Sequence, residues 1–271
     1  MIHALRQIFI IAALSLNMVS LAGAQTLSLD GNNGDQPVTI EAQNGIEWLR
    51  DEQTYVARGN AQVNRGDVSI KADVLTAYYR ATAGTETEIY QIEAVGNVVL
   101  TSPNQQARGK QLLYDMDKAV ISLTGGPVEF KTKDQVLTAN DSLSYWPRKQ
   151  TAIAKGRARV TQSGRLLTAD LLTAYFQEDA DGNVTIHQVF ADGDVQIETK
   201  GETATGNKGA YDARTDTATL TGDVRLIRGN DQLQGSHAEV DFTTGISRLL
   251  ARKNTDRVRG VFTPKPKTKR E

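Results

Sequence analysis

Apolar and polar residues alternate along most of the chain, and a repeated phrase organises the alternation. Six segments begin with glycine, followed by a mostly polar residue, Ala or Val, any residue, and an apolar residue. A small residue, Ala or Gly, stands thirteen residues after each of these glycines. Self-similarity of this kind predicts a repeat architecture. The phrases begin at Gly59, Gly96, Gly126 (chosen over the adjacent Gly125), Gly156, Gly193 and Gly222.

A longer duplication lies on top of the short repeat. Residues 72–79 (ADVLTAYY) and 169–176 (ADLLTAYF) match at six of eight positions, 97 residues apart. Gly59 and Gly156 keep the same separation, and a polar insert follows each matching segment. The pattern predicts two tandem halves of three units each, at about residues 49–145 and 146–250.

A constant offset of thirteen residues suits a β-hairpin. Pairing each glycine (position 0) with the small residue at +13 places +2 opposite +11 and +4 opposite +9. Four residues then remain for each loop, for example Asn64–Asp67, and every such loop contains Gly, Pro, Asn or Asp. These residues supply the backbone conformations that turns require.

Successive strand residues point to opposite faces, so the repeat separates a dry face from a wet one. All eighteen residues at +2, +4 and +11 are apolar, whereas seventeen of the eighteen at +1, +3 and +12 are not, Val99 being the exception. This is the pattern of antiparallel sheets with one buried face. The dry face comprises Val63, Ile70, Val98, Leu100, Val128, Phe130, Leu137, Val160, Leu167, Val195, Ile197, Val224, Leu226 and Leu233, together with Ala61, Ala107, Ala158 and Ala204.

The segments between the hairpins also read as strands, at residues 75–79, 119–123, 171–176 and 217–220. Helical periodicity appears only near the N-terminus. We therefore expect an all-β chain of stacked antiparallel hairpins, elongated along the repeat axis, whose dry faces bury one another. Two sheets about 10 Å apart are the expected arrangement.

The N-terminus has the features of a cleavable export signal. Arg6 precedes the apolar run Ile8–Leu16, and Ala22-Gly23-Ala24 provides a small-x-small cleavage site. The run is shorter than the roughly 20 residues that a membrane span needs. Residues 1–24 are the predicted signal peptide and 25–34 a flexible N-terminus, so the mature protein is expected to be soluble and exported.

Composition narrows the function classes. The chain has 31 Lys and Arg against 32 Asp and Glu, and such a near-neutral balance gives no indication of a nucleic-acid partner. It has no cysteine, so neither a disulfide framework nor an N-terminal lipid anchor is expected.

Residues that would carry catalysis or bind a cofactor are not apparent. Neither His187 nor His237 belongs to a cluster at metal-ligand spacing, and His3 falls in the signal segment. The stretch Asp179–Asn183 resembles part of a calcium loop but lacks the closing glutamate, which favours a hairpin tip. We expect no enzyme, no catalytic residue, no metal site and no cofactor.

With these features together, the chain resembles the periplasmic lipopolysaccharide-transport bridge family (LptA, also called OstA-like). The resemblance rests on the exported N-terminus followed by Asp35–Glu41, on the recurring Ala-x-Gly-Asn/Asp-Ala/Val-x-apolar phrase, and on the run Val68–Asp73. It covers roughly residues 35–262. The chain departs from the family pattern in its length, with two three-unit halves.

The resemblance implies an open, twisted β-jellyroll that binds the lipid A acyl chains of lipopolysaccharide in its apolar interior. It also implies a periplasmic location, head-to-tail stacking, and partners in the inner and outer membranes. Without the resemblance, an apolar inner face is also what the core of an ordinary β-sandwich looks like. A structural β-repeat protein of the envelope with no ligand is therefore the alternative. The small residues at 0 and +13 have two possible explanations: they leave room for acyl chains, or they allow the sheets to approach closely.

The ends of a repeat stack leave unpaired strand edges, which invite association. The expected N-terminal edge lies near Val38–Glu41, and the C-terminal edge near Ala238–Phe242 or Arg257–Phe262. Joining one end to the other would give head-to-tail oligomers that do not close. Residues 263–271, with two prolines and four basic residues, predict a disordered tail that is either merely solvated or in contact with lipid phosphates.

Overall fold

The computed structural model describes residues 38–81, 87–178, 184–241, 243–244, 246–251 and 257–263. Over these ranges the chain is almost entirely β, and eighteen strands join one antiparallel sheet. The predicted signal peptide, residues 25–34 and the tail after Thr263 lie outside the described residues. Within the described ranges, no helix has the length and apolarity needed to cross a membrane. The elements are β1 (Thr39–Glu41), β2 (Ile46–Leu49), β3 (Thr54–Arg65), β4 (Val68–Ala81), β5 (Thr87–Ser102), β6 (Gln105–Asp115), β7 (Val120–Thr124), β8 (Val128–Thr132), β9 (Gln135–Ala139), β10 (Ser142–Trp146), the 3-10 turn η1 (Pro147–Lys149), β11 (Thr151–Gln162), β12 (Arg165–Glu178), β13 (Val184–Thr199), β14 (Glu202–Asp212), β15 (Thr217–Arg228), β16 (Asp231–Asp241), β17 (Ile246–Leu250) and β18 (Arg259–Val261).

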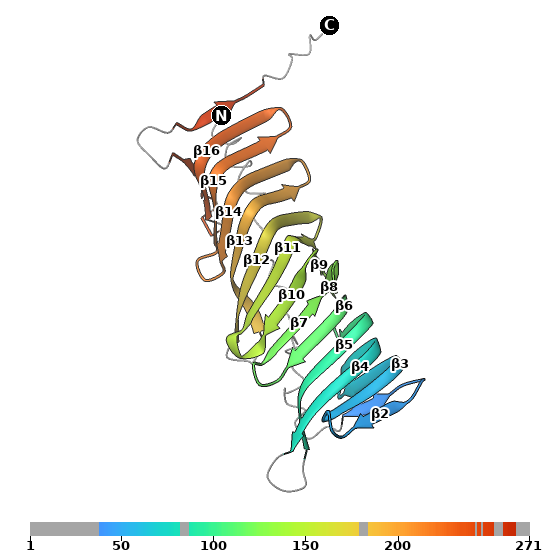
Figure 1. Cartoon of the computed structure of the whole chain (residues 1–271). Helices are drawn as coiled ribbons and strands as arrows, with labels where there is room; N and C mark the ends of the chain where they lie inside the picture. The colour runs from blue at the N-terminus through green and yellow to red at the C-terminus, as the bar shows by residue number, and fades with distance from the viewer. Residues whose placement is uncertain are drawn as a thin grey trace.

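The strands stack in chain order, from β2 and β3 at one end to β16 at the other, and give an elongated body (Figure 1). Four positions in the stack are each shared by two short strands: β1 with β2, β7 with β8, β9 with β10, and β17 with β18. For example, β7 and β8 both pair with β6, and β9 and β10 both pair with β11. The predicted all-β, elongated jellyroll of repeated hairpins is confirmed.

The hairpins are present, but the predicted register is wrong by two residues. Ala61 pairs with Ala72 and Val63 with Ile70, so +2 lies opposite +13 and +4 opposite +11. The other five hairpins repeat this register; Val128, for example, pairs with Ala139. The connecting turns are therefore two residues shorter than expected. A shift of two residues leaves every side chain on its original face, so the predicted faces survive the error.

The repeated glycine marks a β-bulge and not the end of a hairpin. At Gly96 and Asn97 the pairing with β4 shifts, and both residues have positive φ, +80° and +48°. Glycine adopts this conformation without strain. Its missing side chain also leaves room for Asp73 of β4, which accepts a hydrogen bond from Asn97 Nδ2 at 3.0 Å. In the third copy the residue with positive φ, +83°, is Gly125, although Gly126 is the glycine that stands thirteen residues before the small residue Ala139.

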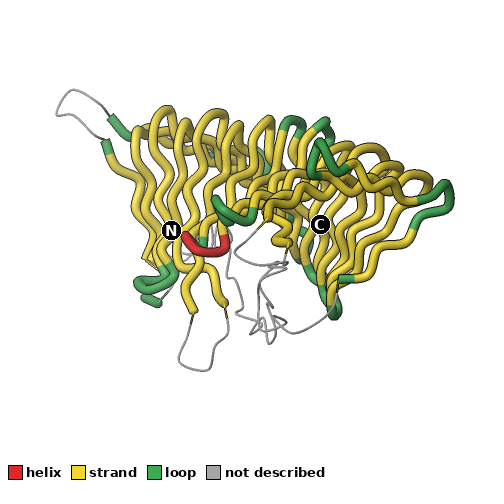
Figure 2. Tube along the Cα trace, turned by 60° about the horizontal axis from the view of Figure 1, so that its bottom comes forward, coloured by secondary structure: helices red, strands yellow, loops and turns green. Residues whose placement is uncertain are grey.

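Bulges bend strands, and here they recur at the middle of successive strands. The sheet consequently curves round on itself along its whole length (Figure 2). This replaces the expected pair of separate sheets with one continuous, bent sheet. The segments predicted as additional strands are, in β4, β12 and β15, parts of the long bent strands, and only residues 120–124 form a short strand of their own.

The two ends of the stack differ slightly from the prediction. At the N-terminal end, β1 pairs with residues 62–64 of β3 and β2 with residues 54–57, as expected for an edge. At the C-terminal end, Ala238 pairs with Leu249 of β17, so the first of the two predicted edges is wrong. The edge is formed by β17 and β18, and the latter lies within the second predicted range.

Candidate functional site

The predicted dry face lines the inside of the bent sheet, which we call the trough. All eighteen of its residues are buried or half-buried, and none of the eighteen residues predicted for the wet face is buried. The +2 residues are the deepest: Val98 is 1% exposed, and Val128 and Val224 are 0% exposed. The predicted dry face is therefore the inner face of the sheet.

The lining continues past the bulge onto the other half of each strand. There Leu75, Ala94, Leu112, Leu172 and Leu220 point inward and are almost fully buried. Register pairing connects them from strand to strand; Leu75 pairs with Ala94, and Ala94 with Leu112. The apolar interior is therefore continuous from β3 to β16.

The trough has an apolar lining and a polar rim near the hairpin turns. In each hairpin the first strand extends two residues further than predicted and includes +6, which lies opposite +9. Because side chains alternate between faces along a strand, +6 lies on the same inward face as +4, and +9 on the same face as +11. Arg165, at the start of β12, is half-buried and lies on the same face as Leu167. The sequence analysis missed these residues. It assigned +6 to a four-residue loop, and it made +9 the first residue of the second strand. Extending the alternation by two residues would have found them. The polar members of the row formed by +6 and +9 are Arg65, Ser102, Gln105, Thr132, Gln135, Gln162, Arg165, Thr199, Glu202, Arg228 and Asp231, and the twelfth member, Val68, is apolar and buried.

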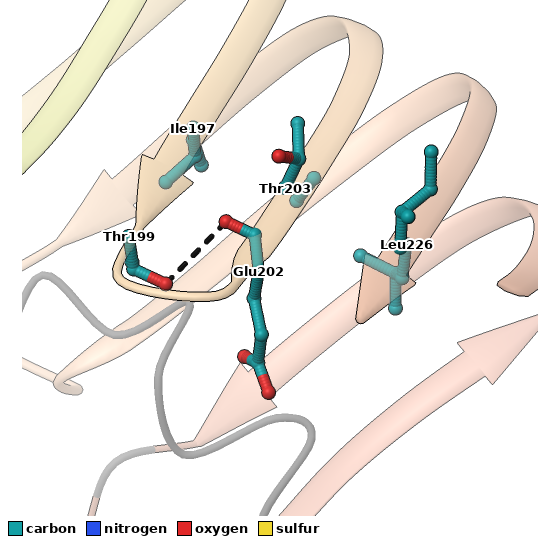
Figure 3. Close-up of a pocket in the computed structure, with 7 residues that line it drawn as sticks. Ile197, Thr199, Glu202, Thr203 and Leu226 are labelled. Atoms are coloured by element: carbon teal, nitrogen blue, oxygen red, sulfur yellow. Dashed lines mark hydrogen bonds between the residues drawn. The ribbon is translucent and has the colours of Figure 1, made fainter. Parts of the chain in front are cut away.

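A small, shallow pocket, partly open to solvent, lies where the rim meets the lining (Figure 3). It lies on β13 to β15 and includes Ile197, Ala204 and Leu226. At its edge Glu202 Oε1 is 3.2 Å from the Arg228 guanidinium. Burial raises the pKa of the Glu202 carboxyl, and the charge of Arg228 opposes that shift. The pocket is therefore apolar with a charged border.

The small residues at +13 have different surroundings from copy to copy. A Cβ added at Gly206 would lie 2.7 Å from Leu220 Cγ, and one added at Gly235 would lie 2.9 Å from Leu249 Cγ. At these two positions the space is already filled by leucines of the inner face. Close packing, and not spare room, explains the glycine there.

The described residues contain no group of three or more His, Cys, Asp or Glu that could hold a metal ion. His187 and His237 are half-buried strand residues. The stretch Asp179–Asn183, considered above as part of a calcium loop, lies outside the described residues.

Large apolar side chains are exposed at both ends of the stack. On the N-terminal edge, Ile46 is 49% and Trp48 is 52% exposed. Trp48 donates a hydrogen bond from Nε1 to the Tyr79 hydroxyl at 2.8 Å, which ties the indole to β4. On the C-terminal edge, Ile246 is 48% and Val261 is 46% exposed.

The chain is similar in sequence and in fold to known proteins. The sequence model of the family described as LptA/(LptD N-terminal domain) LPS transport protein matches twice, over residues 39–141 and 139–246. Together the two matches cover well over half of the chain. The chain belongs to this family. The family is one of lipopolysaccharide transport proteins, and the resemblance described above is thereby confirmed.

Two individual proteins of this kind are similar to the chain. A Rhizobium meliloti (strain 1021) protein called uncharacterized protein R00383 is 26% identical over 159 residues, covering 57% of this chain and 80% of that protein. The crystal structure of LptH, the LptA-homologous periplasmic component of the lipopolysaccharide transport device of Pseudomonas aeruginosa, is 20% identical. It aligns with a TM-score of 0.40, over 48% of this chain and 95% of that one.

Proposed function

We propose that the protein is a periplasmic lipopolysaccharide-binding transport protein whose trough shields the lipid A acyl chains from water. The observation that carries the proposal is the continuous apolar lining from β3 to β16, in which the five middle members of the row formed by +4 and +11 stay half-buried. Partly open apolar positions in an otherwise dry trough fit a surface that a ligand completes.

The energetics explain why a continuous trough suits this task. Each CH₂ group transferred from an apolar environment to water costs about 0.8 kcal/mol. An acyl chain of about twelve carbons would therefore cost on the order of 10 kcal/mol if it crossed water bare. A protein that carries such lipids needs an apolar path without gaps. No catalytic step is required of it, and we propose neither an enzymatic activity nor a cofactor.

We further propose that the two ends of the stack make the connections of a bridge between the membranes. The edge strands β1 and β2 at one end and β17 and β18 at the other offer unpaired backbone groups beside exposed apolar side chains. Strand addition joins such edges, either between copies of this chain or with inner- and outer-membrane components of the transport machinery. The predicted signal peptide would deliver the protein to the periplasm.

The ends can be tested by sedimentation velocity. We expect the sedimentation coefficient of the mature protein to rise with concentration, and Ile46→Lys to reduce that rise because the new charge would lie in the joint. A wild-type protein that stays monomeric at high concentration would contradict head-to-tail assembly.

Co-purification tests the lipid-binding function. The protein is isolated from the periplasm of a Gram-negative host and analysed by mass spectrometry for lipid A. Leu167→Asp places a charge inside the trough, whereas Thr168→Asp places the same charge on the outer face of the same strand. We expect lipid with the wild type and with Thr168→Asp, and much less with Leu167→Asp. Lipid-free protein in all three cases would instead favour the structural β-repeat alternative.

A further inference from the structure

One row of the trough lining is less deeply buried in the middle of the stack than towards its ends. In the row formed by +4 and +11, Val63, Ile70 and Leu100 of the first strands are 2–3% exposed, and Leu226 and Leu233 near the other end are 8% exposed. Between them, five consecutive members of the row are only half-buried. These five, called the open row, are Phe130, Leu137, Val160, Leu167 and Ile197.

Strand pairing makes the open row continuous. Phe130 pairs with Leu137, Leu137 with Val160, Val160 with Leu167, and Leu167 with Ile197. Neighbouring strands lie 4.7–4.9 Å apart, so five strands give a row about 19 Å long. The acyl layer of one bilayer leaflet is about half of the 30 Å hydrocarbon core, or roughly 15 Å. The open row is therefore long enough to hold an extended acyl chain.

The rim beside the open row is basic. Arg165 is the inward-facing rim residue of β12, two positions before Leu167 on the same face. Exposed Lys133 lies beside Asp134 in the β8–β9 turn, and exposed Lys200 lies in the β13–β14 turn. At the far end of this segment, Glu202 is already paired with a cation, Arg228. The cations near the open row thus outnumber the acidic groups.

We propose that the ligand occupies the middle of the trough and not its full length, with an acyl chain along the open row and an anionic head group at the Arg165 rim. The inference rests on the proposed function and specifies where and how the lipid is held. An apolar row of acyl-chain length beside a basic rim matches an amphiphile with a negatively charged head. Arginine suits such a rim because its planar group makes paired hydrogen bonds to phosphate or carboxylate.

Direct binding measurements with the purified mature protein test the assignment. The probes are lipid A carrying its phosphates, the same lipid A with its phosphates removed, and inorganic phosphate. The variants are Arg165→Gln, Arg165→Lys and, as a matched control on the outer face of the neighbouring strand, Arg159→Gln, which is exposed. Thermal melts of each variant establish that it is folded.

We expect Arg165→Gln to weaken binding of phosphorylated lipid A roughly tenfold, the loss of one charged hydrogen bond. Arg165→Lys keeps the charge but not the paired hydrogen bonds and should retain only part of the affinity, and Arg159→Gln should have no effect. Binding of the dephosphorylated lipid should not depend on Arg165, and inorganic phosphate should compete weakly, because it lacks the acyl chain.

The other outcomes separate the two proposals. If the wild type binds lipid A but Arg165→Gln and Arg159→Gln behave alike, the head-group assignment is wrong and the proposed function stands. If inorganic phosphate binds at Arg165 while lipid A binding is insensitive to the substitution, the rim is an anion site unconnected with the lipid, which also overturns the assignment. If the wild type binds no lipid A, both proposals fail.

Discussion

Gly193→Ala should destabilise the fold clearly more than Gly164→Ala, although the two glycines have nearly the same backbone conformation. Their φ angles are +77° and +76°. A side chain in this left-handed region costs about 1–2 kcal/mol, and both variants incur that cost. They differ in surroundings: nothing lies within 4 Å of a Cβ added at Gly164, whereas one added at Gly193 would lie 2.8 Å from Asp170 Cβ and 2.9 Å from Asp170 Cγ.

The collision sets the size of the difference. Overpacking of a filled site costs typically about 1–3 kcal/mol. For a chain of this size, 1 kcal/mol corresponds to about 2–4 °C in Tm. Gly193→Ala should therefore melt roughly 2–12 °C below Gly164→Ala. Differential scanning calorimetry of the two variants beside the wild type measures this directly. We attribute the need for glycine at the bulge to an Asp or Asn side chain of the neighbouring strand that packs against it. Equal melting temperatures for the two variants would refute this explanation.

Two further predictions concern the inner face and the response to high pH. Val98→Thr should cost about 1–3 kcal/mol, because it buries a hydroxyl at a site that is 1% exposed, whereas Val99→Thr on the outer face should stay within about 0.5 kcal/mol. Urea unfolding distinguishes them, and equal losses would contradict the assignment of faces. Burial, with a hydrogen bond to Asp216, raises the pKa of Tyr211 from 10.0 to about 12. The folded protein then keeps a proton that the unfolded chain loses, so this contribution to stability is full below pH 10.0 and is lost as pH rises towards 12. Stability should fall less steeply over this range in Tyr211→Phe, as measured by urea unfolding at about pH 9 and about pH 11, and an unchanged slope would contradict the shift.

The sequence was sufficient to predict the two faces, because alternation depends only on strand geometry. Each of Val98, Val128 and Val224 could be placed inside from its position in the phrase alone. The register could not be predicted reliably, because a shift of two residues produces the same alternation. The loop chemistry also agreed with the wrong register, since the true turn at Gly66-Asp67 lies inside the predicted loop.

The bulge and the open row depend on three-dimensional information. A glycine in a strand pattern is compatible with a turn, a bulge or close packing, and only the backbone conformation of Gly96 and Asn97 identifies the bulge. Val63 and Val160 occupy equivalent positions in the phrase, yet one is 3% exposed and the other half-buried. That difference depends on the neighbouring parts of the structure that pack over each strand. The sequence of a single repeat does not contain this information.

The most direct test of the trough as a lipid path is site-specific photo-crosslinking in living Gram-negative cells. A photoreactive residue is introduced at Val160 or Leu167 on the inner face, and at Arg159 or Thr168 on the outer face of the same strands. Lipopolysaccharide adducts are expected from the two inner positions and not from the two outer ones. Adducts from the outer positions alone, or in equal amounts from both faces, would contradict the account.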